Sequence, residues 1–597
     1  MAGLFAQKQP RPSDAPASRL PAACEEHTPS HWSCYPPRLP VVTYQRHAKR
    51  GRLDSRANRV RRLCESVTGA QDRLVRGPHT PARWRPVAAL GALGTLIVIL
   101  TVGACASPRP GRDRVRPGPP STRLPNVIVI LADDLGYGDV GAFGQTRIKT
   151  PRLDRMAAEG LRLTQFYAGS PVCAPSRATL LTGRHTGHAI VRDNLELGGF
   201  ADNEERGQMP LPPDTPTLAR ALKTAGYRTA LIGKWGLGGP GSTGVPTRQG
   251  FDAFFGYLDQ KQAHNHYPSH LWRNETWTPL RNGDFSPHQR LTGDPRDPAS
   301  YTAFKGQDYA LDVMTADAVR FLEQQGDAPF FLYFAPTVPH LALQVPDAAL
   351  TPYAGAFEET PYTGDRGYLP HPTPRAAYAA MITYMDAQIG RLLDTLQARG
   401  LDDNTLVIFT SDNGATFRTG GADTDFFQSV GPLRGRKGEV YEGGIRVPFI
   451  ARWPDHVPAG RSSDHVAAIW DVWTTLAEIS GGAVRPPAET DGVSFAPTLL
   501  GRAGQRTHEA RDAALYWEYH AAGGSQAVRL GPWKGVRTKV RNRPDAPIEL
   551  YDLRVDVSET NNLAAQHPDI VAQIAAVMRS RTPSPVAAWN FVDVKPQ

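Results

Sequence analysis

Long runs of apolar residues recur along the chain with little interruption by polar residues. Four of them cover residues 125–134, 227–235, 329–335 and 405–414. Continuous runs of this length are typical of strands buried on both faces, as in parallel sheets. Helical patterns lie between them, and the clearest cover residues 151–160, 217–226 and 374–400. The alternation predicts an α/β fold, with a large mainly parallel or mixed sheet flanked by helices.

The pattern changes after about residue 505. Three short segments there are predicted to form strands of a meander, and they cover residues 513–519, 526–534 and 548–553. An amphipathic helix is predicted over residues 567–578. We therefore expect a main domain over residues 124–505 and a smaller α+β subdomain over residues 506–597.

The N-terminal region has a different composition. Residues 1–86 are rich in Pro, Arg, Ser and Ala without an amphipathic period, which indicates disorder or a start codon assigned too far upstream. Residues 87–105 form an uncharged apolar stretch of 19 residues, close to the roughly 20 that span a bilayer. Its ending, Val102-Gly-Ala-Cys105, resembles a bacterial lipoprotein box, with Cys105 as the acylated residue.

An uncleaved transmembrane anchor and an ordinary cleaved signal are the alternatives to a lipoprotein for residues 87–105. Residues 106–123 are predicted to be a Pro/Gly/Arg linker. All three interpretations place residues 124–597 outside the cytoplasm, in the periplasm or at the cell surface, and the lipid or the helix would hold the protein at a membrane.

The charge distribution argues against a nucleic-acid partner. The chain carries a net charge of +9, but residues 1–123 contribute +14 and residues 124–597 contribute −5. A mildly acidic body lacks the broad basic surface that phosphate-backbone binding requires. Five cysteines in 597 residues also exclude a disulfide scaffold. Cys173 is the only cysteine of the body, since Cys24, Cys34, Cys64 and Cys105 all precede it.

Chemically capable side chains follow each of the four predicted strands. They are Asp133, Asp134, Lys234, His340, Asp412 and Asn413. Ligands of open α/β sheets bind beyond the carboxyl ends of the strands, so these residues are expected to meet. Three carboxylates and an amide suit a hard cation, Ca²⁺ or Mg²⁺, and leave room for oxygens of the substrate or the nucleophile in the coordination shell.

A motif around Cys173 makes the prediction more specific. The segment reads Cys173-Ala-Pro-Ser-Arg177, in what the pattern indicates is the first turn of a helix, where backbone N–H groups face an anion. With the segments 131–139, 233–235, 411–414 and 435–446, it resembles the sulfatases of the alkaline-phosphatase superfamily. The resemblance covers most of residues 124–565 and is highly specific, because the motifs occur together and in this order. It makes 124–505 the catalytic domain and implies an alkaline-phosphatase-like fold, with the C-terminal sheet and helix packed against it.

The resemblance also implies a mechanism. A formylglycine-generating enzyme would convert Cys173 to Cα-formylglycine, whose hydrate attacks sulfur with one hydroxyl and expels sulfate with the other. Asp133, Asp134, Asp412, Asn413 and the modified residue 173 would bind Ca²⁺. Arg177 would steady the formylglycine, Lys234 and Lys437 would hold sulfate oxygens, and His340 would protonate the leaving oxygen.

The sequence departs from the family pattern at Gly236, where many members have a histidine thought to deprotonate the second hydroxyl. His264 is our candidate replacement, and a solvated loop residue is the alternative. His185, His188, Arg192 and Asn194 are further pocket candidates. The stretch 264–305 is a candidate pocket wall through His264, His266, Tyr267, Trp272 and Trp277. Trp517, Trp533 and Lys534 are expected to pack in the core rather than touch substrate.

The predicted function is hydrolysis of sulfate monoesters in a sulfated small molecule or glycan. Two alternatives remain at this point. One is a phosphonate or phosphate monoester hydrolase, since related enzymes use the same modified cysteine. The other is an inactive exported glycan-binding homologue that keeps an unmodified thiol at position 173.

Overall fold

The computed structural model describes residues 123–508 and 514–591. The predicted N-terminal segments 1–86 and 87–105, with Cys105, and nearly all of the linker 106–123 lie outside the described residues. Within the described ranges, no helix combines the length and apolar character needed to cross a bilayer.

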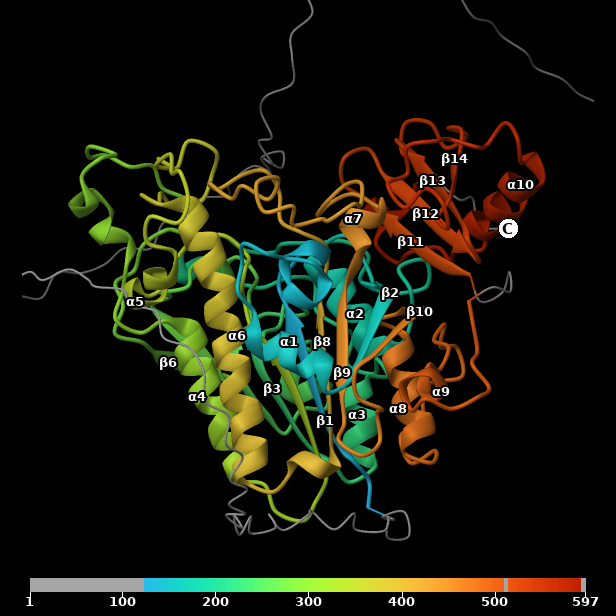
Figure 1. The fold of residues 1–597 in the computed structure, drawn as a ribbon, viewed down its shortest axis with the longest axis horizontal. Coiled ribbons are helices and arrows are strands. Elements are labelled where there is room, and N and C mark those ends of the chain that lie inside the picture. Colours follow the sequence, from blue (N-terminus) through green and yellow to red (C-terminus); the bar gives the residue numbers. More distant parts are fainter. Residues whose placement is uncertain (1–122, 509–513, 592–597) are drawn as a thin grey trace, which may run out of the picture. The chain divides into compact units, whose positions relative to one another are not determined.

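A ten-stranded mixed sheet forms the centre of the fold, in the order β10-β2-β9-β8-β1-β7-β3-β4-β5-β6 (Figure 1). The four predicted strands are β1 (Asn126–Ala132), β3 (Arg228–Lys234), β7 (Phe330–Ala335) and β8 (Thr405–Ser411). They are neighbours and parallel, because β8, β1, β7 and β3 pair in that order. The predicted large sheet is confirmed, and its central strands end at one common edge.

The other strands of this sheet were not predicted. They are β2 (Leu161–Tyr167), β4 (Ala253–Tyr257), β5 (His270–Arg273), β6 (Thr276–Pro279), β9 (Arg446–Arg452) and β10 (Arg461–Ala468). β4 is parallel to β3, and β10 is parallel to β2. The antiparallel pairs β2–β9, β8–β9, β4–β5 and β5–β6 make the sheet mixed.

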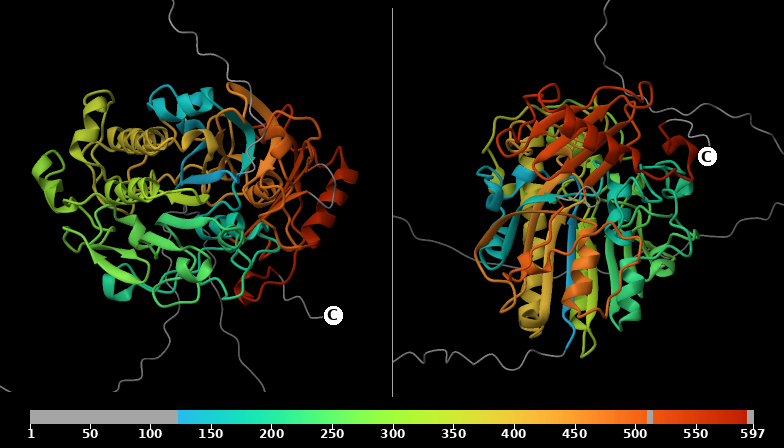
Figure 2. Two further views of the ribbon diagram at one scale, coloured as in Figure 1. Left: turned by 90° about the horizontal axis from the view of Figure 1, so that it is seen from below. Right: turned by 90° about the vertical axis from the view of Figure 1, so that its right-hand side faces the viewer.

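Two hydrophobic cores lie on opposite faces of the sheet. Successive β1 residues alternate between them, with Val127 and Val129 in one core and Ile128 and Ile130 in the other. Helices cover both faces (Figure 2). They are α1 (Pro151–Ala158), α2 (Cys173–Thr182), α3 (Leu218–Thr224), α4 (Ala310–Glu323), α5 (Asp347–Leu350), α6 (Pro374–Ala398), α7 (Glu442–Ile445), α8 (Asp471–Ile479) and α9 (Ala496–Leu499). The helices predicted over 151–160, 217–226 and 374–400 correspond to α1, α3 and α6.

The C-terminal part forms a separate four-stranded antiparallel sheet with helix α10 (Pro568–Arg579) packed on it. Its strands are β11 (Leu515–Tyr519), β12 (Ser525–Leu530), β13 (Trp533–Thr538) and β14 (Glu549–Asp552). The prediction of one strand over 526–534 is wrong, because the chain turns there and β12 and β13 pair as a hairpin. Gly531 adopts φ +56° and Pro532 offers no N–H, so the two residues break the strand.

A buried ionic cluster joins this sheet to the main domain. The Lys534 ammonium lies 2.9 Å from Glu442 Oε1 of α7 and 3.0 Å from Glu559 Oε1, and all three side chains are fully buried. Glu442 Oε2 also accepts a hydrogen bond from Tyr167 of β2. As expected, Lys534 belongs to the core and not to a substrate pocket.

Replacing Lys534 by methionine is expected to destabilise the protein by about 3–5 kcal/mol, because Glu559 would remain buried without its cation and Glu442 would keep only Arg446, at 3.2 Å. Equilibrium unfolding in urea measures this difference. Lys539→Met is the matched control at an exposed position of the same subdomain, and it should change stability by less than about 0.5 kcal/mol. Equal effects of the two substitutions would contradict the structural role of the cluster.

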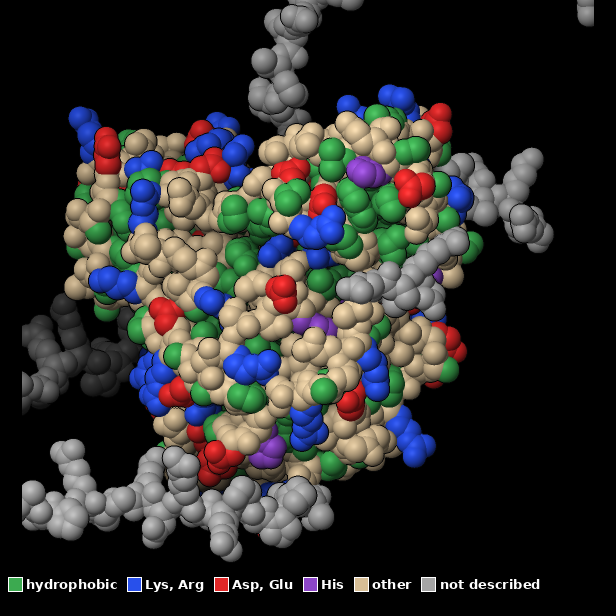
Figure 3. All heavy atoms as spheres, turned by 45° about the vertical axis from the view of Figure 1, so that its right-hand side comes forward, with side chains coloured by type: hydrophobic (Ala, Val, Ile, Leu, Met, Phe, Trp, Pro, Cys, Tyr) green, Lys and Arg blue, Asp and Glu red, His purple; other side chains and the backbone are tan. Residues whose placement is uncertain are grey.

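Charged side chains of both signs are interspersed on the face of the molecule drawn in Figure 3. A surface of this kind is unlike the broad basic area that binds a nucleic-acid backbone.

Candidate active site

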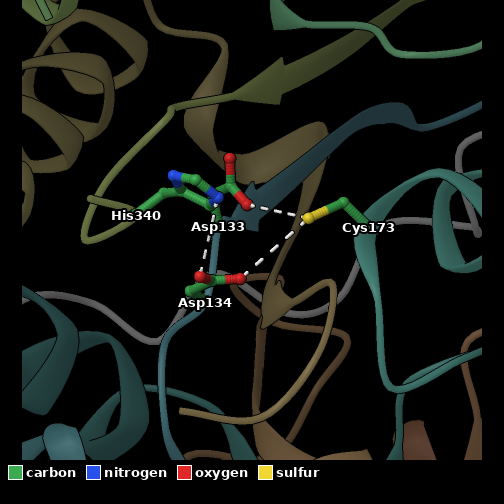
Figure 4. Close-up of side chains that lie close together, drawn as sticks. All are labelled: Asp133, Asp134, Cys173 and His340. Carbon is green, nitrogen blue, oxygen red and sulfur yellow. Dashed lines mark hydrogen bonds and ion pairs between the residues drawn. The ribbon is translucent and has the colours of Figure 1, made fainter. Parts of the chain in front are cut away.

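The polar residues predicted at the strand ends lie close together. Asp133 and Asp134 follow β1, Asp412 and Asn413 follow β8, and Lys234 is the last residue of β3. His340 comes from the loop after β7, where Pro339 forms a bridge with Asp133. Figure 4 shows the Asp133, Asp134 and His340 side chains converging with Cys173. All of these side chains are buried, with relative exposures of 2% or less.

Helix α2 brings Cys173 to this edge of the sheet, since Cys173 is its first residue. The Cys173 sulfur lies 3.5 Å from Asp133 Oδ1 and 4.0 Å from Asp134 Oδ1. Burial raises the pKa of Cys173, although the nearby ammonium groups of Lys234 and Lys437 oppose this shift. The unmodified side chain is therefore a neutral thiol at neutral pH.

Arg177, one turn further along α2, ties the helix to two strand ends. Its Nε and Nη2 donate hydrogen bonds to Asp412 Oδ2 at 3.1 and 2.7 Å, and Nη1 donates to the Lys234 carbonyl at 2.8 Å. The side chain has no exposed surface. This planar, fully paired guanidinium fixes the position of Cys173 relative to the strands.

Two lysines face the carboxylates. Lys234 Nζ lies 2.7 Å from Asp133 Oδ2, and Lys437 Nζ lies 2.9 Å from Asp134 Oδ2. Burial disfavours ionisation of both aspartates, but Lys234 and Lys437 together with other nearby cationic groups outweigh it and lower the pKa of Asp133 and of Asp134. Both aspartates are thus carboxylates at neutral pH. The pKa of Asp412 is raised to about 6 by burial and by Asp133, although Arg177 opposes the shift.

The same residues fit a divalent cation. Asp133, Asp134 and Asp412 supply carboxylate oxygens, the ligands that Ca²⁺ and Mg²⁺ prefer. Asn413 donates from Nδ2 to Asp134 at 2.8 Å, which leaves its buried Oδ1 without a hydrogen-bond partner among the described residues. A buried oxygen acceptor without a hydrogen-bond partner, next to three carboxylates, is what a cation site lined by oxygen atoms requires.

His340 and His264 stack at this site, with ring centroids 4.7 Å apart. His340 donates from Nδ1 to the Leu341 carbonyl at 2.7 Å, and its Nε2 lies 3.7 Å from Asp134 Oδ2. Burial and Lys437 lower the pKa of His340 to about 3, against the influence of Asp134. The ring is therefore neutral until additional negative charge enters the site.

Gln260 fills the space beside Gly236. Gly236 adopts φ +82°, and a Cβ at this position would lie 2.7 Å from Gln260 Cγ, so a side chain here would strain the backbone and force Gln260 to move. The Gln260 amide donates to Asn194 Oδ1 at 3.4 Å, and Asn194 Oδ1 also accepts from the Ala174 N–H at 3.0 Å. The predicted pocket candidate Asn194 thus adjoins Cys173, while Gln260 carried no motif that would have identified it.

The predicted anion-binding N–H groups of α2 are largely engaged. Pro175 has none, the Ala174 N–H bonds Asn194, and the Ser176 N–H bonds the Val172 carbonyl at 3.4 Å. The expectation that the start of this helix binds an anion through backbone N–H groups is therefore wrong for these positions. The positive charge beside Cys173 comes from the side chains of Lys234 and Lys437.

Three other pocket candidates lie elsewhere. His185 and His188 follow the far end of α2 and contact Asp491, with His188 Nδ1 2.8 Å from Asp491 Oδ1. Arg192 is fully buried and pairs with Glu518 of β11 at 2.8 Å. The Arg192–Glu518 pair joins the main domain to the C-terminal subdomain, whereas Asp491 belongs to the main domain, and none of these contacts involves Cys173.

The residues proposed for the pocket wall over 264–305 do not lie together in the structure. His264 lies beside His340, and His266 Nε2 donates a hydrogen bond to the His340 carbonyl at 2.9 Å. Trp272 and Trp277 belong to the β5–β6 hairpin at the sheet edge. Trp272 donates from Nε1 to Glu205, and no hydrogen bond among the described residues joins either tryptophan to the residues around Cys173.

Fold and site together define a hydrolase with the alkaline-phosphatase-like architecture. Residues 125–482 match the Sulfatase family, and residues 436–582 match the family described as N-sulphoglucosamine sulphohydrolase, C-terminal. The chain therefore belongs to the sulfatase family and is a sulfuric ester hydrolase.

Several known proteins are similar to this chain. N-acetylgalactosamine-6-sulfatase of Canis lupus familiaris is 31% identical over 471 residues, covering 76% of this chain and 75% of the relative. N-acetylgalactosamine-6-O-sulfatase of Bacteroides thetaiotaomicron is 30% identical over 516 residues, covering 77% and 93%. The crystal structure of Ps i-CgsB in complex with k-i-k-neocarrahexaose has a TM-score of 0.62 and 26% identity, covering 76% of this chain and 92% of that chain.

Proposed function

We propose that the protein hydrolyses sulfate monoesters of carbohydrates, with Cys173 converted to Cα-formylglycine and Ca²⁺ bound beside it. The observation that carries this proposal is the position of Cys173, whose sulfur lies 3.5 Å from Asp133 in a cluster of carboxylates and lysines. A neutral thiol is a poor nucleophile, which supports modification of this residue before catalysis.

The residues of the site have three roles: they hold the cation, bind the sulfate group and position helix α2. Asp133, Asp134, Asp412 and Asn413 would hold the cation, with the modified residue 173 as a further ligand. The cation would supply positive charge that lowers the pKa of a hydroxyl next to it and neutralises the carboxylates. Lys234 and Lys437 bind the sulfate oxygens, and Arg177 holds the start of α2 in place.

His340 transfers a proton to the leaving oxygen through Nε2, since its Nδ1 is committed to the Leu341 carbonyl. Burial and Lys437 disfavour the protonated ring. An anionic ester bound next to His340 adds negative charge, which favours protonation when the substrate is present.

Removing the His340 imidazole is thus expected to slow the hydrolysis of esters with poor leaving groups more than the hydrolysis of nitrophenyl esters.

The similar proteins support a carbohydrate substrate. One relative is an N-acetylgalactosamine-6-sulfatase and another an N-acetylgalactosamine-6-O-sulfatase, and a structurally similar protein is complexed with k-i-k-neocarrahexaose. A formylglycine-generating enzyme is the partner that the Cys173 motif requires. We also propose an extracytoplasmic location, with the protein attached to a membrane through the lipidated Cys105 or the apolar segment around it.

Mass spectrometry of the peptide that contains Cys173 tests the modification. Conversion of the thiol to the aldehyde should lower the peptide mass by about 18 Da, since one sulfur and two hydrogens leave and one oxygen enters. Co-expression with a formylglycine-generating enzyme is expected to raise the modified fraction and the specific activity in proportion. Full activity in a preparation that contains only the thiol would contradict the proposal.

Selectivity between nitrophenyl sulfate and nitrophenyl phosphate separates the sulfatase from a phosphate monoester hydrolase. We expect kcat/KM to favour the sulfate by at least about 10²-fold, since the lysines are matched to a singly charged ester. A preference for the phosphate, measured with the modified enzyme, would favour the alternative activity.

A further inference from the structure

A chain of hydrogen bonds runs from the backbone of Tyr368 through His288 to His264. The Tyr368 N–H donates to His288 Nδ1 at 3.2 Å, and His288 Nε2 lies 3.1 Å from His264 Nδ1. Tyr368 adopts φ +63°, a conformation that is uncommon for a residue with a side chain. The Tyr368, His264 and His288 rings also pack on one another, with centroids 4.6–5.3 Å apart.

The order of donors and acceptors in this chain fixes the proton of each imidazole. Burial lowers the pKa of His264 and lowers that of His288 to about 4, so both rings are neutral and each carries one N–H. A backbone N–H can only donate, so His288 Nδ1 is an acceptor and its proton is on Nε2. His288 Nε2 then donates to His264 Nδ1, and the proton of His264 must be on Nε2.

His264 Nε2 has no hydrogen-bond partner among the described residues. Its ring stacks on His340, whose Nε2 faces Asp134, so it is placed beside the group that meets the substrate. A neutral imidazole with its proton on Nε2 is a donor at that atom and cannot accept a second proton there. This arrangement disagrees with the role as a base that the sequence suggested for His264.

We propose that His264 binds an oxygen of the sulfate ester through Nε2–H, and that His288 is a positioning residue that holds His264 in this donor tautomer. The inference rests on the proposed function for the identity of the acceptor. The tautomer itself rests only on the hydrogen bonds of Tyr368, His288 and His264.

Two substitutions at His288 test the proposal as a matched pair in the full-length protein. His288→Gln can keep an amide donor toward His264 Nδ1, whereas His288→Glu offers only acceptor oxygens and draws the His264 proton to Nδ1. Both variants lose His288 Nδ1, the atom that accepts from the Tyr368 N–H, so this loss is common to the pair. We expect kcat/KM for nitrophenyl sulfate to stay within about threefold in the glutamine variant and to fall about 10–100-fold in the glutamate variant, the effect of losing one hydrogen bond to an anion.

Long-range ¹H–¹⁵N correlation spectra of histidine-labelled protein read the tautomer without any substrate, with His264→Gln used to assign the signal. The expected result is a proton on Nε2 in the wild type and on Nδ1 in His288→Glu. A wild-type His264 protonated on Nδ1 would overturn the tautomer, and a glutamate variant at least as active as the glutamine variant would show that His264 works as a base. Absence of sulfatase turnover in the modified wild type would instead contradict the proposed function and leave the NMR result unaffected.

Discussion

Replacing Cys173 by alanine or serine is expected to lower turnover of nitrophenyl sulfate by at least about 10³-fold, because both variants lack the residue that is oxidised. Serine still has a hydroxyl that can take the sulfuryl group, but no second hydroxyl to expel it. The serine variant should therefore release close to one nitrophenol per active site and then stop. The alanine variant should release none.

Both variants are expected to fold. Cys173 is buried, and the hydrogen-bond partners of its sulfur among the described residues are carboxylate oxygens of Asp133 and Asp134. Losing one small side chain of this kind costs on the order of 1 kcal/mol, so urea unfolding should be close to that of the wild type. Sustained turnover by a well-folded alanine variant would exclude residue 173 as the nucleophile.

Removing divalent cations is the second change with a large expected effect. Dialysis against EDTA should reduce turnover by at least about 10³-fold, since the site would lose several kcal/mol of charge stabilisation. Added Ca²⁺ should restore activity more completely than Mg²⁺. Three carboxylates and one amide give a coordination shell of irregular geometry, which Ca²⁺ tolerates and Mg²⁺ does not.

Thermal unfolding detects binding of the cation without a measurement of activity. At a Ca²⁺ concentration of 100 times Kd the folded state should gain about 2.7 kcal/mol. Asp134→Asn should abolish this gain, whereas Asp294→Asn, an exposed carboxylate at 50% side-chain exposure, should keep it. A stabilisation by Ca²⁺ that survives Asp134→Asn would place the cation elsewhere.

The sequence was sufficient to predict the central part of the sheet but not its edges. β1, β3, β7 and β8 are buried on both faces, so their apolar runs are continuous and easily recognised. β9 contains Pro448 between two arginine ends, and β10 begins with five polar residues. Such strands are stabilised by pairing with β2, β8 and the packed helices, which a local pattern does not reveal.

Some residues of the candidate site could be predicted from the sequence and others could not. Asp133, Lys234 and Asp412 were predictable because strand ends meet at one edge and the motifs mark them. Gln260 and His288 act through contacts with residues 24 or more positions away, such as Asn194 and His264, and no local pattern distinguishes them. Their positions become apparent only in the folded chain, where Gln260 donates a hydrogen bond to Asn194 and His288 lies 3.1 Å from His264 Nδ1.

The ion cluster of Lys534 has a consequence for the order of events during synthesis. Lys437 lies five residues before Glu442, and Glu442 pairs both with Arg446 at 3.2 Å and with Lys534, which lies on a strand near the end of the chain. A nascent polypeptide that stops before position 534 therefore leaves Glu442 with one of these two cations, beside the loop that carries Lys437. We expect this part of the molecule to reach its full stability only after nearly nine-tenths of the polypeptide has been synthesised.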